Sequence, residues 1–181
     1  MSKTIVLVGM MGSGKTALGR QLAQRFNLPF CDSDSEIEKA TGMRIAHIFE
    51  EQGEAAFREI ERIKIAKLLA GTPCVLSTGG GAVLNPQTRQ LIASSSIAIW
   101  LKARLETLLA RVAKDKNRPL LKTADPATKM QQLLQMREAF YAQAPIHIDT
   151  DIKSFEETVE AMCHAVQNHP AFKGQTSGNP L

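Results

Sequence analysis

Short apolar runs along the chain alternate with longer stretches in which apolar residues recur every three or four positions. The apolar runs predict strands, and they lie at Thr4 to Val8, Phe30 to Cys31, Cys74 to Ser77, Ile97 to Leu101 and Ile146 to Asp149. Helical spacing follows the first strand at Leu18, Leu22 and Phe26 and recurs from Leu105 to Val112. Because strands and helices alternate, the pattern predicts an α/β fold with a parallel sheet.

Polar signals mark where the other helices begin and end. Ser33-x-x-Glu36 and Ser35-x-x-Glu38 both have capping-box spacing, which predicts a helix that starts just beyond Asp34 and ends at Gly42. Further helices are expected from about Arg44 to Leu69 with an interruption at Gly53, from Pro126 to Ala144, and from the cap Ser154 to about Asn168. Residues 169–181 offer little that a core would bury, so a frayed tail is expected there.

The size of the chain limits its organisation. With 181 residues, 44% of them hydrophobic, it is long enough for one well-buried domain, expected over residues 1–168, and too short for two of ordinary size. No apolar run reaches membrane-spanning length and the first strand begins almost at Met1, so we expect no membrane partner, no targeting segment and a cytoplasmic location. Cys31, Cys74 and Cys163 form no CxxC pair, which favours reduced thiols over a disulfide framework or a zinc site.

The net charge of +4 is compatible with a nucleic-acid partner but does not require one. Aromatic residues make up only 5% of the chain, and no basic run is interleaved with stacking rings. An active site that binds anionic ligands would use the same excess of positive charge, and we expect no nucleic-acid partner.

The segment Gly9-Met-Met-Gly-Ser-Gly-Lys-Thr16 lies between the first strand and the first helix. In that position the glycines allow a tight turn that aims backbone N–H groups at a phosphate, and the helix N-terminus adds partial positive charge. Lys15 then reaches the β- and γ-phosphates, and Thr16 offers its hydroxyl to Mg²⁺. A glycine-rich turn without function is the alternative, but the full match in strand-loop-helix context favours a nucleotide-binding P-loop. The residues expected at the nucleotide phosphates are Gly12, Ser13, Gly14, Lys15, Thr16 and Ala17.

The rest of the chain narrows the class of P-loop protein. A GTPase needs a guanine-reading Asn-Lys-x-Asp segment, which is absent from the sequence. A motor-type ATPase needs a hydrophobic strand that ends in an acidic residue, yet the strands at 74–77 and 97–101 end in Thr78-Gly79-Gly80-Gly81 and in Lys102. A small kinase, which holds a second substrate beside the γ-phosphate, fits better.

Asp32 and Asp34 follow the second strand, at the edge of the sheet where doubly wound folds bind ligands. Asp32 is a candidate to support Mg²⁺ through water, and Asp34 to accept a hydrogen bond from a substrate hydroxyl as its general base. A second interpretation of Asp34, as the cap of the next helix, remains open.

Two further segments suit an anionic second substrate. In Phe57-Arg58-x-x-Glu61, Arg58 and Glu61 share one helical face, so the carboxylate can orient a guanidinium that grips a substrate carboxylate. An exposed ion-pair network is the alternative interpretation. Thr78-Gly79-Gly80-Gly81 lets backbone N–H groups approach a ligand with no side chain between them, although a plain turn is also compatible with it.

The polar segment from Lys114 to Asp125 separates two helices and predicts a lid that folds over a ligand. Arg118 in this segment is a candidate to stabilise the transferring phosphoryl group, and Arg137 in the next helix to pair with the substrate carboxylate. Arg111, just before the lid, is a candidate to stack on adenine. Each of these arginines is also compatible with a solvated surface position.

Together these segments resemble the ordered motifs of the shikimate kinases, over about residues 4–165. The matching residues are Gly9-x-x-Gly12-x-Gly14-Lys15-Thr16, Asp32-x-Asp34, Phe57-Arg58-x-x-Glu61, Thr78-Gly79-Gly80-Gly81, Arg118-Pro119 and Arg137. The resemblance implies a nucleoside-monophosphate-kinase-like, three-layer α/β/α fold with a central five-stranded parallel sheet, a substrate-binding helical region near residues 33–62, and a lid at about 114–125. It also implies that MgATP phosphorylates the 3-hydroxyl of shikimate, on the route to chorismate and the aromatic amino acids.

The resemblance further implies a role for each matching residue. Shikimate would be held by Asp34, Arg58, Gly80, Gly81 and Arg137. The catalytic set would be Lys15, Asp34 and Arg118; Thr16 and, through water, Asp32 would hold Mg²⁺; and Arg111 with Arg118 would flank the nucleotide. Lys153 stands near where some members carry an adenine-contacting arginine, so this chain departs from the pattern there.

Two rival functions follow from the same motifs. Another hydroxy-acid kinase, such as one acting on gluconate, would also suit two arginines and an aspartate. A regulatory module that uses ATP only as a switch predicts that Asp34, Arg58 and Arg137 do not converge in space. The small size and the lack of an interface stripe favour a monomer.

Overall fold

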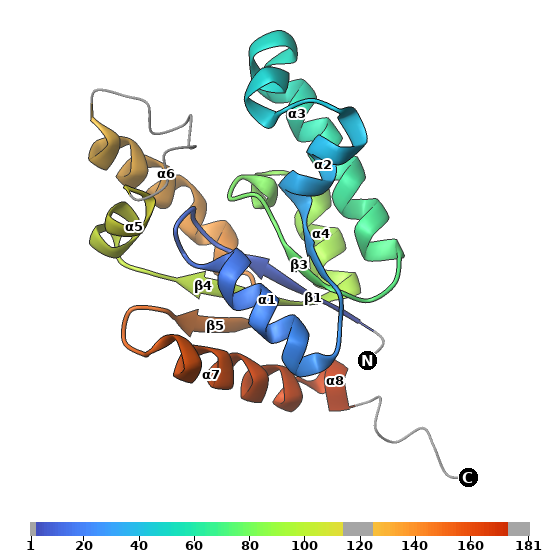
Figure 1. The fold of residues 1–181 in the computed structure, drawn as a ribbon, viewed down its shortest axis with the longest axis vertical. Helices are drawn as coiled ribbons and strands as arrows, with labels where there is room; N and C mark the ends of the chain where they lie inside the picture. Colours follow the sequence, from blue (N-terminus) through green and yellow to red (C-terminus); the bar gives the residue numbers. More distant parts are fainter. Residues whose placement is uncertain (1–2, 114–124, 174–181) are drawn as a thin grey trace.

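A five-stranded parallel sheet forms the centre of the molecule, with helices on both faces, in a computed structural model that describes residues 3–113 and 125–173 (Figure 1). The strands are β1 (Thr4–Val8), β2 (Phe30–Asp32), β3 (Val75–Ser77), β4 (Ser96–Lys102) and β5 (Ile146–Asp149). The helices are α1 (Lys15–Phe26), α2 (Ser33–Thr41), α3 (Ile45–Ala70), η1 (Ala82–Leu84), α4 (Pro86–Ser95), α5 (Leu105–Val112), α6 (Pro126–Tyr141), α7 (Phe155–Asn168) and α8 (Pro170–Lys173). The predicted α/β class and all predicted strands are confirmed.

The strand order β2-β3-β1-β4-β5 places β1 at the middle of the sheet. Every neighbouring pair is parallel, with Ile5 opposite both Val75 and Ile97. All strands therefore end at the same edge. From β1 the chain crosses to β2 on one side of the sheet, whereas from β3 it crosses past β1 to β4 on the other side, so the strand order reverses next to β1. Open α/β sheets bind their ligands at such a reversal of strand order, outside the carboxyl ends of the strands.

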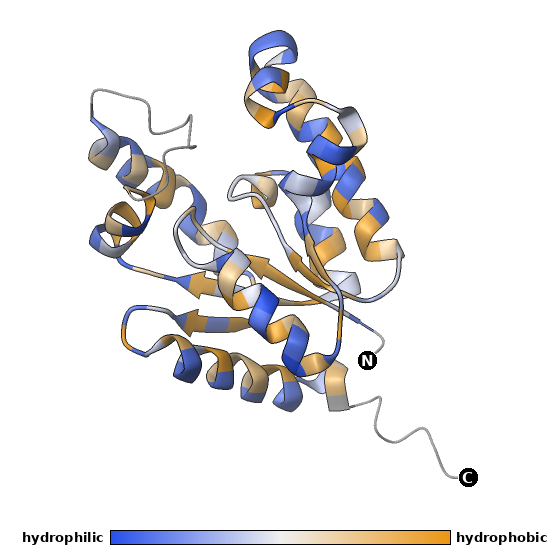
Figure 2. Ribbon diagram, viewed as in Figure 1, coloured by the Kyte–Doolittle hydropathy of each residue, from blue (hydrophilic) through white to orange (hydrophobic). Residues whose placement is uncertain are grey.

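Two hydrophobic cores hold the three layers together, because the side chains of each strand alternate between the faces of the sheet. Val6 and Val8 face a core shared with α3, α4, α5 and α6, whereas Ile5 and Leu7 face one shared with α1 and α7. The strands are apolar almost throughout, whereas the helices are apolar on one side only (Figure 2).

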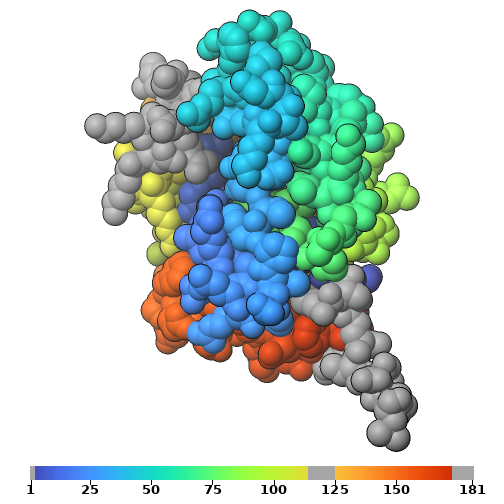
Figure 3. Space-filling model, turned by 45° about the vertical axis from the view of Figure 1, so that its right-hand side comes forward, coloured from blue at the N-terminus to red at the C-terminus, as the bar shows by residue number. Residues whose placement is uncertain are grey.

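The α2 helix and the first half of α3 form a lobe with its own small core of Ile37, Ile48 and Phe57. The lobe projects beyond α1 in the space-filling view (Figure 3). The predicted interruption of α3 is present at Gly53, whose φ of 80° and ψ of 171° suit glycine alone. The start of α2 differs from the prediction, because Asp32 is the N-cap and accepts hydrogen bonds from the N–H groups of Asp34 and Ser35.

Two helical segments after β3, η1 and α4, were not predicted from the sequence. Asn85 caps α4 through hydrogen bonds from Gln87 and Thr88, and Pro86 occupies the first turn. Asn followed by Pro is a common helix start, so a local signal was present in the sequence. The helix periodicity of 86–95 is weak because only Thr88 and Ile92 are buried.

The C-terminal part of the described chain also differs from the expectation of a frayed tail after Asn168. Residues 170–173 form the short helix α8, and the ring of Phe172 meets Phe26 of α1 edge-on at 5.8 Å. The three cysteines are free thiols, with Cys74 and Cys163 buried, as predicted. Within residues 3–113 and 125–173, no helix combines the length and apolar character needed to cross a bilayer.

Gly19, in the middle of α1, lies where this helix packs against the sheet, so a substitution at this position tests the packing. A Cβ atom at this position would lie 2.7 Å from Cε2 of Phe30 and 2.9 Å from Cδ1 of Leu7. We therefore expect Gly19→Ala to lower the free energy of urea unfolding by about 1–3 kcal/mol, although alanine is the better helix former. Gly71→Ala is the matched control, since its Cβ would make only ordinary contacts of 3.5 and 3.6 Å, and it should change stability by less than about 0.5 kcal/mol. Equal effects of the two substitutions would contradict this account.

Candidate active site

The loop between β1 and α1 has the backbone geometry of a phosphate cradle. Gly9, Gly12 and Gly14 adopt positive φ angles of 144°, 80° and 93°, which side-chain-bearing residues rarely adopt. A Cβ at Gly9 would lie 2.7 Å from the carbonyl oxygen of Leu101, so β4 also limits this position. The Lys15 ammonium donates to the carbonyl oxygens of Gly9 and Met10, each at 2.8 Å, and therefore lies over the loop that it is expected to serve.

Thr16 and Asp32 meet at the start of α1 and the end of β2. The Thr16 hydroxyl donates to Oδ2 of Asp32 at 3.4 Å, while Oδ1 of Asp32 caps α2. A hydroxyl and a carboxylate oxygen side by side are hard donors of the kind Mg²⁺ prefers. The residues that were predicted to hold Mg²⁺ thus fit the ion by the chemistry of their donors.

Asp34 lies beside the glycine loop that follows β3. Burial raises the pKa of its carboxyl above the ordinary value, and the nearby Asp32 carboxylate raises it further, while Lys15 and Arg58 oppose the shift. Since Asp32 provides the cap of α2, the carboxylate of Asp34 remains available to a ligand. The capping interpretation of Asp34 is therefore wrong, and the cap belongs to the neighbouring acid.

Each glycine of the loop at 79–81 has a different functional group against its Cα. A Cβ at Gly79 would lie 2.6 Å from Oε1 of Glu61 and 2.9 Å from Oδ1 of Asp34, and one at Gly81 would lie 2.6 Å from Cζ of Arg58. At Gly80 the nearest atom would be Nη1 of Arg137, at 3.4 Å. A side chain at Gly79 or Gly81 would require these groups to shift, so the arrangement favours close approach by functional groups over a plain turn.

Arg58 is positioned by two acids of α3. Its guanidinium donates to Oε2 of Glu61 at 2.7 Å and to Oε1 of Glu54 at 3.1 Å. Only 18% of the Arg58 side chain and 3% of the Glu61 side chain are exposed, so the exposed-network alternative is wrong for this pair. Burial raises the pKa of Glu61, whereas Arg58 opposes that shift. Oε1 of Glu61 is buried and has no hydrogen-bond partner among the described residues.

Arg137 lies on α6 and is 4% exposed, which rules out the solvated-surface interpretation. Its Nε is buried and lacks a hydrogen-bond partner within the described part of the chain. Tyr141, one turn further along α6, donates its hydroxyl proton to the carbonyl oxygen of Gly80. Sequence reasoning missed Tyr141, and the only signal for it was its spacing of four residues from Arg137.

Arg111, a candidate to stack on adenine, makes contacts that the sequence did not predict. It donates to the carbonyl oxygen of Thr150 at 2.9 Å, to its hydroxyl at 3.0 Å and to the carbonyl oxygen of Gly12 at 3.4 Å. It therefore joins the phosphate loop to the segment after β5. The predicted lid with Arg118 lies outside the described residues.

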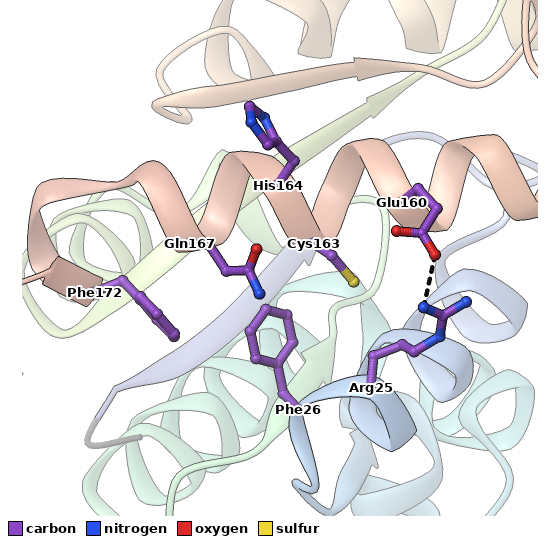
Figure 4. A pocket seen from close by; sticks show the side chains of 7 residues that line it. All are labelled: Arg25, Phe26, Glu160, Cys163, His164, Gln167 and Phe172. Atoms are coloured by element: carbon purple, nitrogen blue, oxygen red, sulfur yellow. Dashed lines mark hydrogen bonds and ion pairs between the residues drawn. The ribbon is translucent and has the colours of Figure 1, made fainter. Parts of the chain in front are cut away.

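A cavity of about 420 Å³ lies elsewhere, between α1, α7 and α8 (Figure 4). Its lining residues are Arg25, Phe26, Glu160, Cys163, His164, Gln167 and Phe172. Arg25 and Phe26 end α1, whereas the phosphate loop precedes the first residue of that helix. At 1.5 Å per residue, the cavity lies most of a helix length from the phosphate loop, and it is not the candidate active site.

Comparison with known proteins decides the family. The family model for shikimate kinase matches residues 11–167. The chain belongs to the shikimate kinase family. A shikimate kinase from Zymomonas mobilis subsp. mobilis is 48% identical over 164 residues, which cover 91% of this chain and 93% of the relative.

Solved structures agree with this assignment. A shikimate kinase from Acinetobacter baumannii in complex with shikimate superposes with a TM-score of 0.87 at 36% identity, over 92% of this chain and 93% of that one. A gluconokinase from Sinorhizobium meliloti reaches a TM-score of 0.59 at 18% identity, over 92% of this chain and 98% of that one. The second likeness concerns the fold alone. The predicted three-layer fold and family are thus confirmed, and Asp34, Arg58 and Arg137 converge as the resemblance implied.

The buried carboxyl of Asp34 affects stability. Its pKa is raised in the folded protein, so the folded state keeps this proton to a higher pH than the unfolded chain. Between the two pKa values the free energy of unfolding therefore falls as pH rises, and charged Asp34 is destabilising at neutral pH. We expect Asp34→Asn to raise the melting temperature at pH 7 by roughly 2–4 °C, the effect of about 1 kcal/mol in a domain of this size.

The stabilisation by Asp34→Asn should disappear below the pKa of the unfolded carboxyl, about 3.9. The matched control is Glu59→Gln, because the pKa of this carboxyl is lowered by Arg62 and its removal should not stabilise the protein. Calorimetric melting curves across this pH range provide the measurement. A lower melting temperature for Asp34→Asn at pH 7 would contradict the raised pKa of the Asp34 carboxyl.

Proposed function

We propose that this chain transfers the γ-phosphoryl group of ATP to the 3-hydroxyl of shikimate, which gives shikimate 3-phosphate and ADP on the route to chorismate and the aromatic amino acids. The observation that carries the proposal is the convergence of Asp34, Arg58 and Arg137 around the loop at 79–81, beside the phosphate loop. A carboxylate-bearing, hydroxylated substrate suits two arginines and one acid. The membership of the shikimate kinase family supports the same substrate.

In the proposed reaction the two arginines hold the substrate carboxylate. Arg58 is preset for this task by Glu61 and Glu54, so little side-chain freedom is lost on binding. Arg137 carries a buried Nε with no partner among the described residues, and a substrate oxygen would satisfy it. The N–H groups of Gly80 and Gly81 complete the site.

Asp34 accepts the proton of the attacking hydroxyl, or orients that hydroxyl, in the proposed mechanism. Its raised pKa makes it a better proton acceptor than an ordinary carboxylate once it is ionised. Lys15, which lowers the pKa of Asp34 through its charge, is proposed to stabilise the γ-phosphoryl oxygens as well. Arg118 is proposed to join Lys15 in this role.

Thr16 and, through water, Asp32 are the proposed Mg²⁺ residues, and Gly12, Ser13, Gly14, Lys15, Thr16 and Ala17 the phosphate-binding ones. Bound Mg²⁺ would neutralise charge on the nucleotide phosphates. Arg111 is proposed to serve the nucleotide from its position between Gly12 and Thr150. A monomer in the cytoplasm without a nucleic-acid partner, with a lid over 114–125, completes the proposal.

The carboxylate clamp is tested by Arg58→Ala in an ADP-release assay with MgATP. With shikimate as substrate we expect kcat/KM to fall about 10- to 150-fold, the effect of losing hydrogen bonds to a charged group. The matched control is Arg62→Ala, because Arg62 lies one turn away on α3 and pairs with Glu59 at the same i,i+3 spacing. That variant should retain activity within about twofold.

Parallel reactions with gluconate and without any second substrate distinguish the proposed function from the two rival functions, another hydroxy-acid kinase and a nucleotide switch. Turnover with gluconate alone would favour the other hydroxy-acid kinase, and no stimulation by either acid would favour the nucleotide switch. Stimulation by shikimate that survives Arg58→Ala would remove Arg58 from the clamp and leave the activity in place.

The metal role of Asp32 can be separated from its capping role by Asp32→Asn. Asparagine keeps the oxygen that caps α2, so the melting temperature should not fall and the KM for shikimate should stay unchanged. The loss of charge should raise the Mg²⁺ concentration for half-maximal activity by about 10- to 100-fold. A titration of activity with Mg²⁺ at saturating ATP measures this, and an unchanged midpoint would exclude Asp32 from the metal site.

A further inference from the structure

The glycine loop that follows β3 is held by two buried hydroxyl groups from distant parts of the chain. At its start, the N–H of Gly79 donates to Oγ of Ser33 at 3.1 Å. In its middle, the hydroxyl of Tyr141 donates to the carbonyl oxygen of Gly80. Ser33 and Tyr141 are 0% and 1% exposed, so neither bond competes with bulk water.

Tyr141 lies where the parts of the site meet. It follows Arg137 by one turn of α6, and its hydroxyl also lies 3.5 Å from Sδ of Met10 in the phosphate loop. Its ring is 6.1 Å from that of Trp100 on β4, so the core holds the phenol in place. Burial raises the pKa of this phenol to about 12, and it therefore stays protonated and able to donate at working pH.

The carbonyl of Gly80 and the N–H of Gly81 belong to one peptide unit. In a planar trans peptide these two groups point in opposite directions, so a bond that fixes the carbonyl also fixes the N–H. Glycine on both sides would otherwise allow this unit to rotate. Within the described chain, neither the N–H of Gly80 nor that of Gly81 has a hydrogen-bond acceptor.

We propose that Tyr141 is a positioning residue, which holds the 80–81 peptide so that the N–H of Gly81 faces the acceptor beside Arg58. The inference rests on the proposed function, because the acceptor is the carboxylate end of shikimate. Tyr141 touches no substrate in this assignment and acts through the peptide unit. The hydroxyl carries the effect, and the ring contributes only packing.

Tyr141→Phe tests the assignment, since it keeps the ring and removes the hydroxyl. We expect the KM and the calorimetric Kd for shikimate to rise about tenfold, because the Gly80 carbonyl loses its donor and the peptide can turn. The KM for ATP should stay within about twofold. The matched control is Ser96→Ala, which removes another buried hydroxyl, bonded to the carbonyl oxygen of Ile92 at 2.6 Å, at the opposite end of β4. It should leave both KM values unchanged.

A second measurement does not depend on the folding of Tyr141→Phe. The chain contains a single tyrosine, so growth on 3-fluorotyrosine labels this position alone and keeps the hydroxyl. The fluorinated protein should retain the wild-type KM for shikimate, and its one ¹⁹F resonance should shift when shikimate is added.

The outcomes separate the two proposals. If the wild type neither binds nor phosphorylates shikimate, the proposed function fails. If the wild type does both, the positioning role is overturned by a shikimate KM within twofold of wild type in Tyr141→Phe, by equal rises in both KM values, or by a ¹⁹F resonance that shikimate does not move.

Discussion

The site depends on the absence of side chains at residues 79–81. Because these positions carry only hydrogen, the loop approaches the carboxylates of Asp34 and Glu61 and the guanidinium groups of Arg58 and Arg137 closely. These four groups come from α2 and α3, which lie together on one side of the loop, and from α6 on the other side (Figure 1). Three successive glycines lose much conformational entropy on folding, so their presence makes sense only where close approach is required. The helices that carry these side chains are arranged around the carboxyl ends of the strands, where the loop approaches them closely.

The close packing of charged side chains around the loop at 79–81 affects both stability and activity. Two acids and two arginines share a space from which water is largely excluded, and burial raises the pKa of both acids. Charge pairing offsets part of this cost, most directly between Arg58 and Glu61. Among residues 3–113 and 125–173, Oε1 of Glu61 and Nε of Arg137 have no hydrogen-bond partner, so the pairing is incomplete within this part of the chain. A bound anion with hydroxyl groups would complete it by offering hydrogen-bond partners to these two atoms.

Much of the fold could be predicted because its signals are local. Every strand was located from a short apolar run, and the interruption of α3 at Gly53 and the capping box at Ser154 were read from single residues. The wrong predictions also arose from local sequence signals. The weak periodicity of 86–95 hid α4, and two overlapping capping-box spacings around Asp34 hid the cap at Asp32.

The sequence by itself determined the α/β class, the phosphate loop, the family and the candidacy of Asp34, Arg58 and Arg137 for one site. These follow from spacing within segments of a few residues, where backbone geometry alone links sequence to chemistry. Tertiary structure decided which groups each residue contacts. Tyr141 and Gly80 are 61 residues apart, and Arg111 and Gly12 are 99 apart, so no local pattern could pair them. Such contacts exist only after the sheet has brought the ends of its strands to one edge, because only packing brings distant segments within hydrogen-bonding distance.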